Sequence, residues 1–461
     1  MKKAVYSVVM ACAAMLAFSC RSRAFAAGSV LVPGAELTLK QAIRISLHNH
    51  PRHKEAFAES LAAGERVGEA RSFLLPQLYG ASEYLRSTDN GIGNTSYYDP
   101  GFFPRMTGRN HNLPGEDFSQ STSSSNNYLG GLAASQFLFD FGRRHGFVTQ
   151  RRFEAAAVAE QAQMTDLDLM FEVSQRYFGL LAAQQLVRVY EKAVEQRQAH
   201  LHEAKVRSAA GLRPALDIYV TDAELERAEL HLVDARNAQA DAKVALDNAL
   251  GLTDVAPNYG LADVLTYQPA TAKLADLLSS AFAQRPDLKV IEDQARAMGA
   301  EIKEYRSDYL PTANIQTGYV AMGTGLPAAN NFNIGLIITW PIFNGFLTTD
   351  QIAEAKYRQQ ALGHAVDDLR QRVVLQVKTA FLDWQAAVDK IDRAQKALIA
   401  SRVELELAEK RYQTGLTNIV ELEDAQRHYT FDDAEYANSL YEYSVAKAKV
   451  DYATAAYLPP L

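Results

Sequence analysis

Arg411-Tyr-Gln-Thr-Gly415-Leu416-Thr-Asn-Ile-Val-Glu421-Leu-Glu-Asp424 is a turn between two long helical patterns. The first pattern begins just after Gly345 and contains no proline, and the second continues to about Ala456. Glycine best tolerates the left-handed conformation found at helix C-termini, so Gly415 predicts a helix end. The stretch therefore predicts a helix hairpin with a tight, acidic tip.

The same pattern occurs earlier, at Arg207-Ser-Ala-Ala-Gly211-Leu212-Arg-Pro-Ala-Leu-Asp217. An arginine, a Gly-Leu pair and an acidic residue recur 204 positions apart. A second match, 235 positions apart, pairs Leu39–Tyr84 with Leu274–Tyr319 and includes Leu75-Pro76 and Leu310-Pro311. One insertion between Tyr84 and Phe139 accounts for the difference between the spacings of 235 and 204 positions. Two long matches in the same order predict that the chain contains an internal duplication of one structural unit.

Each copy predicts the same order of elements. A helical stretch of roughly 35 residues, interrupted at Pro51 or Pro286, precedes the Leu-Pro pair. Two segments follow in which apolar residues alternate with small or polar ones, as is typical of strands. These segments are 78–85 and 128–139 in the first copy, and 313–321 and 331–340 in the second. The insertion Arg86–Asn127 is rich in Ser, Asn, Gly and Pro, which predicts a long loop between two strands.

The longest predicted helices run from Gly142 to Gly211 and from Gly345 to Gly415. At about 1.5 Å per residue each would be roughly 100 Å long, which does not fit an ordinary globular domain. Apolar residues in the second recur at 366, 369, 373, 377, 380, 384, 388, 391, 394 and 398. This spacing predicts packing against neighbouring helices. Return helices are expected at about 215–250 and 419–456, beside the tip half of each long helix.

The first 26 residues are predicted to be a signal peptide. Lys2 and Lys3 precede an apolar run, and Ala24-Phe25-Ala26 is a suitable cleavage site. Cys20 raises the alternative of lipid attachment. The residues before it fit a lipid-attachment signal poorly, so we expect cleavage after Ala26. The only cysteines, Cys12 and Cys20, lie in this segment, so the mature chain is expected to have no disulfide or thiol chemistry.

Charge and motif content exclude several classes of function. The net charge of −7 becomes −11 without the four basic residues of the signal peptide, which disfavours nucleic acid as a partner. The sequence contains no phosphate loop or nucleophile elbow. His48, His50 and His53 cluster beside Pro51, but their spacing does not demand a metal. We therefore expect no enzyme activity, no cofactor and no metal.

The strands predict the location of the protein. Beyond the signal peptide no apolar run approaches the ~20 residues of a membrane helix. The strand segments match the ~9–11 residues that cross a membrane in a barrel. A barrel in lipid must close, and one chain offers only four strands, so closure requires several chains. Three chains would supply twelve strands. The alternative, edge strands of a soluble α+β protein, is disfavoured by the length of the helices.

These features together resemble the TolC family of outer-membrane efflux and secretion channels. The resemblance covers essentially the whole mature chain and rests on three kinds of junction, each present twice. They are Leu75-Pro76 and Leu310-Pro311 before strands, Phe139-Asp-Phe-Gly-Arg143 and Pro341-Ile-Phe-Asn-Gly345 after strands, and the two Gly-Leu tips.

The resemblance implies an α+β membrane protein with four transmembrane strands and long coiled-coil helices per chain. The chain would form a homotrimer, with a twelve-stranded β-barrel continuous with a periplasmic α-helical barrel. Its expected location is the outer membrane of a Gram-negative bacterium, in contact with lipid. Expected partners are a periplasmic adaptor and an inner-membrane transporter of the ABC or RND type. Residues 27–255 and 256–461 would be the first and second outer-membrane efflux protein repeats.

The resemblance also implies roles for residues at the tips. Glu421 and Asp424 match a periplasmic gate, where rings of carboxylates would attract cations. The alternative is that both are solvated acids stabilised by the helix dipole. Tyr412 and Asp217 match a closing contact between tips. The family pattern can place an arginine where this chain has Thr417.

Two arginines are candidates to replace that missing arginine, Arg213 and Arg411. The exposed ends expected to dock the adaptor comprise Gly211, Leu212, Gly415 and Leu416, together with Arg207 and Arg411. Other charged residues on the helices are interpreted as solvated faces.

Two other functions remain open from the sequence. One is a periplasmic coiled-coil scaffold or adaptor that binds partners without forming a pore. The other is a surface receptor that uses the Arg86–Asn127 loop.

Overall fold

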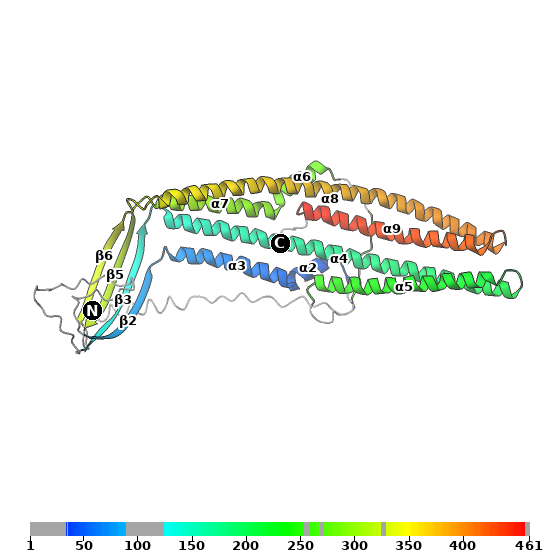
Figure 1. The fold of residues 1–461 in the computed structure, drawn as a ribbon, viewed down its shortest axis with the longest axis horizontal. Helices are drawn as coiled ribbons and strands as arrows, with labels where there is room; N and C mark the ends of the chain where they lie inside the picture. Colours follow the sequence, from blue (N-terminus) through cyan, green and yellow to red (C-terminus); the bar gives the residue numbers. More distant parts are fainter. Residues whose placement is uncertain are drawn as a thin grey trace, which may run out of the picture.

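The computed structural model describes residue 34 and residues 36–88, 124–252, 259–267, 272–323 and 329–456. The predicted signal peptide with Cys12 and Cys20, and most of the Arg86–Asn127 insertion, lie outside the described residues. Figure 1 shows an elongated molecule with the long strands at one end and the helix hairpin tips at the other. Within the described chain, no helix is long and apolar enough to cross a bilayer.

Short helices precede the strands in both copies, as predicted. In the first copy these are α2 (Leu39–Asn49) and α3 (Pro51–Ser72), and in the second α6 (Leu274–Gln284) and α7 (Pro286–Ser307). A proline is the first residue of α3 and α7 because its missing N–H has no partner in the first helical turn anyway. The interruption at these prolines is therefore confirmed.

All four predicted strands are present and form one antiparallel sheet. They are β2 (Gln77–Thr88), β3 (Ser124–Phe139), β5 (Thr312–Gly323) and β6 (Ala329–Thr339), in the order β2-β3-β5-β6. The two copies meet in the centre, where β3 pairs with β5. The register places Leu132, Tyr319 and Phe332 opposite one another, so they share one face of the sheet.

That face is apolar and uncovered. Along β6, Phe332, Ile334, Leu336 and Ile338 are each 61–66% exposed. Large exposed apolar surfaces of this kind mark contact with a partner or a membrane.

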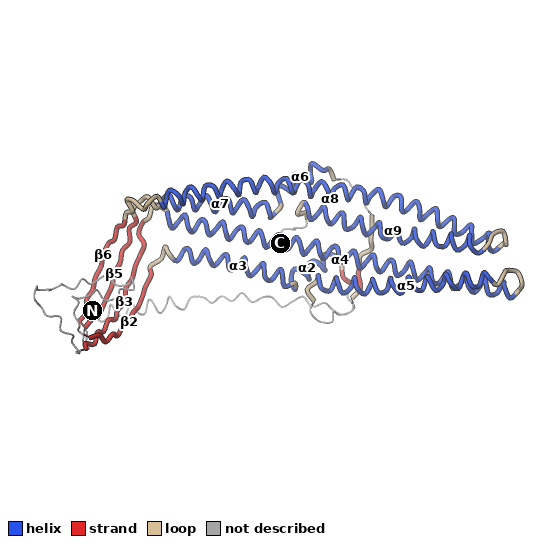
Figure 2. Tube along the Cα trace, in the orientation of Figure 1, coloured by secondary structure: helices blue, strands red, loops and turns tan. Residues whose placement is uncertain are grey.

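The two long helices predicted from the sequence are confirmed. The helices α4 (Arg143–Ala209) and α8 (Leu347–Gln413) have 67 residues each, which corresponds to about 100 Å. Their return helices are α5 (Leu216–Ala249) and α9 (Ile419–Ala453). In Figure 2 the short helices flank the strand half of each long helix, and the return helices flank the tip half.

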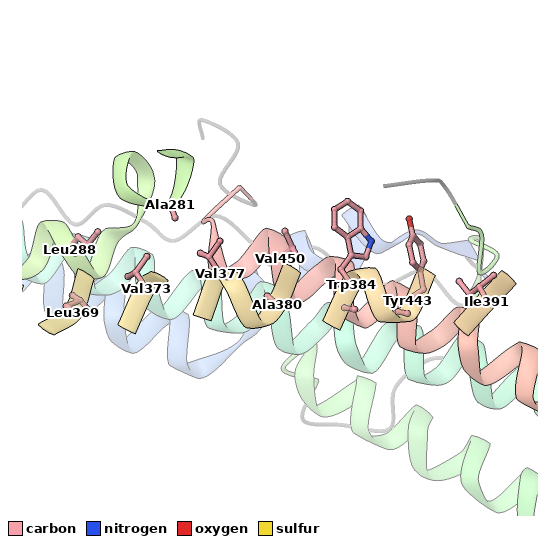
Figure 3. Close-up of a cluster of buried hydrophobic side chains, with 13 residues drawn as sticks. Ala281, Leu288, Leu369, Val373, Val377, Ala380, Trp384, Ile391, Tyr443 and Val450 are labelled. Atoms are coloured by element: carbon pink, nitrogen blue, oxygen red, sulfur yellow. The ribbon is translucent and has the colours of Figure 1, made fainter. Parts of the chain in front are cut away.

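The predicted apolar stripe of α8 forms much of the core. Figure 3 shows side chains of this stripe packed among residues from α6, α7 and α9. The buried positions of the stripe are Leu369, Val373, Val377, Ala380, Trp384 and Ile391. A stripe repeated every three or four residues keeps one face of a long helix against its neighbours along its length.

A small parallel sheet was not predicted. It pairs β1 (Glu36–Leu37) with β4 (Gly260–Leu261) beside the middle of α4. Tyr177 of α4 is completely buried there, with its hydroxyl 2.7 Å from the Leu37 carbonyl oxygen and 2.7 Å from a carboxylate oxygen of Asp263. Two-residue strands leave no periodicity in a sequence, so this sheet could not be detected from it.

Candidate functional site

The two hairpin tips terminate their long helices in the same way. Gly211 and Gly415 have φ of 68° and 77°, which glycine adopts without steric cost. The next backbone N–H at each tip closes a bond of 2.9 or 2.8 Å to a carbonyl in the last helical turn, which completes a Schellman motif. Leu212 and Leu416 remain 72% and 73% exposed. Each tip therefore presents an apolar side chain outward.

Arg207 and Arg411 occupy matching places but make different side-chain contacts. The carbonyl of each accepts the Schellman bond at its own tip. Arg207 Nη1 also donates to the Gln413 carbonyl at 3.1 Å and so reaches the other hairpin. Arg411 Nη1 instead lies 3.2 Å from Glu421 Oε1 within its own hairpin. Only Arg207 of this pair links the two tips.

Tyr412 and Asp217 come together as predicted, from α8 and α5. Both side chains are buried, and the Tyr412 hydroxyl donates to Asp217 Oδ2 over a long 3.5 Å. Burial and the nearby Asp217 carboxylate raise the pKa of Tyr412. The phenol therefore keeps its proton and stays a donor at neutral pH.

Arg213 reaches from the first tip to the second. Its Nη2 donates to the carbonyls of Tyr412 at 3.1 Å and Thr417 at 2.9 Å. Its guanidinium also lies 4.6 Å from the centre of the Tyr412 ring. Among the described residues, Asp217 forms no ion pair with Arg213 or Arg411. The link that Arg213 makes between the tips thus uses backbone carbonyls and an aromatic face.

Glu421 and Asp424 lie on the first turns of α9 and are both about half exposed. Asn418 caps this helix by accepting the Glu421 N–H at 3.0 Å. The Glu421 carboxylate accepts from Thr417 Oγ1 and pairs with Arg411. Asp424 pairs with Arg427 at 2.9 Å. Within one chain, both carboxylates therefore have partially exposed partners.

The interpretation of the remaining helical charges as solvated faces is wrong for one cluster. Arg197, Glu224 and Glu423 are buried where α4, α5 and α9 meet. Arg197 Nη1 donates to Glu224 Oε2 at 3.1 Å and also to Glu423 Oε2. Glu423 lies between the buried Leu422 and the half-exposed Asp424, so the helical pattern alone places it at the edge of the apolar face.

Aromatic residues gather where the strands join the long helices. Trp340, Phe343 and Phe346 follow β6 and are 61–76% exposed. Trp340 Nε1 donates to the Tyr309 carbonyl at 3.0 Å, which fixes the indole at the junction. Exposed aromatic rings at the end of an apolar strand surface are typical of a membrane–water boundary.

In the part of the chain that the structure describes, no group of His, Cys, Asp and Glu could hold a metal ion. His53 lies 2.6 Å from Asp166, and the His50 side chain accepts the Arg52 N–H. Both histidines therefore have structural partners at the start of α3.

Comparison with known proteins is consistent with this geometry. The family model of outer membrane efflux proteins matches residues 42–252 and 277–456. The outer membrane protein TolC of Salmonella enteritidis is 25% identical over 427 residues, which is 88% of this chain and 79% of that protein. The alkaline protease secretion protein AprF of Pseudomonas aeruginosa is 22% identical over 433 residues, 90% and 84% of the two chains.

A crystal structure of CusC has the same fold. It superposes with a TM-score of 0.73 at 19% identity and covers 93% of this chain and 95% of that one. The family match spans most of the chain and both copies of the repeat. The chain therefore belongs to the outer membrane efflux protein family and is an outer-membrane channel of the efflux and secretion class.

Proposed function

We propose that three copies of this chain assemble into a continuous exit duct from the periplasm to the exterior. Their sheets would close a twelve-stranded barrel in the outer membrane, and their long helices would form a hollow periplasmic cylinder. The duct would work with a periplasmic adaptor and an inner-membrane ABC or RND-type transporter. The observation that carries this proposal is the open, apolar-faced sheet joined directly to helices of about 100 Å.

The sheet supports closure by several chains. Its outer strands, β2 and β6, each pair with only one neighbour in the described chain. Unpaired backbone groups at such edges cost several kcal/mol each in lipid. Joining β6 of one chain to β2 of the next removes all edges once the ring closes. Three chains satisfy the usual minimum of eight strands and the even number typical of bacterial barrels.

The helices support the same assembly. Exposed apolar side chains continue along α5, at Leu230, Val233 and Val244, and along α8, at Leu375 and Leu382. Because the two copies are equivalent, packing α8 of one chain against α5 of the next would repeat the α4–α9 packing seen within one chain.

Native mass spectrometry and planar-bilayer recording test the proposal together. The detergent-purified protein should have the mass of a trimer and should insert to give stepwise conductance. A monomer that stays soluble without detergent and never conducts would contradict it.

The exposed tips are the proposed docking site for the adaptor. Cross-linkers attached through Leu212→Cys and Leu416→Cys should capture the adaptor in cells. Tyr357→Cys, an exposed position near the strand end of α8, serves as the matched control. Equal capture from both places would remove the tips from the docking site.

The gate acids should set the response to multivalent cations. Glu421→Gln combined with Asp424→Asn is expected to raise the half-blocking concentration of a trivalent cation about threefold, because six carboxylates leave the mouth of the trimer. The expected effect is moderate because Arg411 and Arg427 already pair with these acids.

Single-channel recordings with and without the cation measure this change. Asp383→Asn, which removes an exposed carboxylate in the middle of α8, is the control. Unchanged block in the double variant would exclude Glu421 and Asp424 from the entrance.

A further inference from the structure

The buried charges between the two hairpins begin about one helical turn from the tip of the second hairpin, where Glu423 is the fifth residue of α9. Arg197 is twelve residues before the end of α4, which places it about 18 Å along the helix axis from the tip. It binds Glu224 of α5 and Glu423 of α9 at the same time. One guanidinium therefore joins the first hairpin to the second by charge-assisted hydrogen bonds.

Other charged groups surround this trio. From α9, Arg427 lies 3.7 Å from Glu224, and Arg227 of α5 pairs with the same carboxylate. His200 of α4 lies 3.8 Å from Glu423 Oε1 and 4.0 Å from Glu409 of α8. Three arginines thus lie near the Glu224 carboxylate. Among the described residues, Arg197 is the only arginine that pairs with Glu423.

The second copy lacks the residues that form this cluster. The position equivalent to Arg197 is Ser401, and the position equivalent to Glu423 is Tyr219. The equivalents of His200 and Glu224 are Glu404 and His428, which form an exposed pair 3.3 Å apart. A buried three-way ionic contact is thus specific to the α4–α9 interface.

Buried charges make separation of these helices costly. If α9 moves away from α4, Glu423 and Arg197 each lose a partner before water has fully replaced it. The contact therefore resists movement of the start of α9 away from α4. The arginine contacts at the tips, by contrast, are made by the partly exposed side chains of Arg213 and Arg207.

We infer that Arg197, Glu224 and Glu423 form a second latch above the tip, which holds the two hairpins of a subunit together and limits how far the mouth opens. This inference rests on the proposed duct. Arg197 is the positioning residue, and Glu423 is the group on the moving hairpin that it holds.

Arg197→Gln tests the latch because it leaves Glu423 as a buried carboxylate without an arginine. We expect the mean single-channel conductance to rise about twofold to threefold, and amide exchange in residues 419–430 to become about tenfold faster. Arg188→Gln, on an exposed face of the same helix, should leave both unchanged.

Adding Glu423→Gln to Arg197→Gln should reverse both effects, because no unpaired charge then remains.

Two outcomes would overturn the latch. One is wild-type exchange in Arg197→Gln, and the other is fast exchange that Glu423→Gln does not reverse. A wild-type protein that fails to conduct would contradict the proposed duct. The exchange measurements would still show whether Arg197 holds the two hairpins together.

Discussion

Arg213→Ala is expected to produce channels that are open for most of a recording, whereas the wild-type protein should be mostly closed. Arg213 donates to two carbonyls of the opposite hairpin and covers the Tyr412 ring. Hydrogen bonds from a charged donor contribute about 1.5–3 kcal/mol each when well shielded. Allowing for partial exposure, we assign about 2 kcal/mol to the whole side chain, which shifts the closed-to-open ratio about 30-fold per subunit.

Neighbouring substitutions give a graded comparison for this result. Arg207→Ala removes one exposed bond to the Gln413 carbonyl and should have a smaller effect. Tyr412→Phe removes only the 3.5 Å bond to Asp217 and leaves the ring under Arg213, so it should have the smallest. Planar-bilayer recording of the three variants measures the order. A larger effect of Tyr412→Phe than of Arg213→Ala would assign the closing contact to the Tyr412–Asp217 pair.

The fold could be predicted from the sequence because each main element occurs in both copies of the repeat. Helices of 67 residues leave a stripe that no other element produces, and the strands alternate with period two. Periodicity depends on regular elements of some length. The two-residue strands β1 and β4 are too short to show it and were missed.

The candidate site was predicted in part, and the reason lies in what each residue binds. Tyr412 and Asp217 occupy positions that the repeat and the family resemblance pair directly. Arg213 binds carbonyls, which every residue carries, so the sequence offers no complementary side chain to identify its partner. Glu423 is joined to Arg197 across 226 residues, and this contact arises only when two hairpins pack.

Glycines at helix ends illustrate a further limit of the sequence. Gly211 and Gly251 follow α4 and α5, and both have positive φ, of 68° and 71°. The sequence presents them as equivalent C-terminal signals. Only the structure shows that a Cβ at Gly211 meets nothing within 4 Å, whereas a Cβ at Gly251 would lie 2.6 Å from His50 Cα.

Gly251→Ala is therefore expected to destabilise the protein far more than Gly211→Ala. The left-handed conformation costs about 1–2 kcal/mol for a residue with a Cβ at either position. At Gly251 the new methyl also meets the backbone of His50, which joins α2 to α3 and cannot move as a flexible side chain would. Overpacking adds about 1–3 kcal/mol, so the total for Gly251→Ala is roughly 2–5 kcal/mol.

Thermal unfolding of the detergent-purified variants by circular dichroism measures the difference. Gly211→Ala should lower the Tm only slightly, because it adds the strain of the left-handed conformation but no steric clash. Gly251→Ala should unfold at a clearly lower temperature or fail to accumulate as assembled protein. The bond from Ser46 Oγ to the Ala249 carbonyl, 2.7 Å in the structure, lies at the same junction and would be strained by the shift. Equal Tm values for the two variants would show that α5 can move away from the α2–α3 junction at little cost.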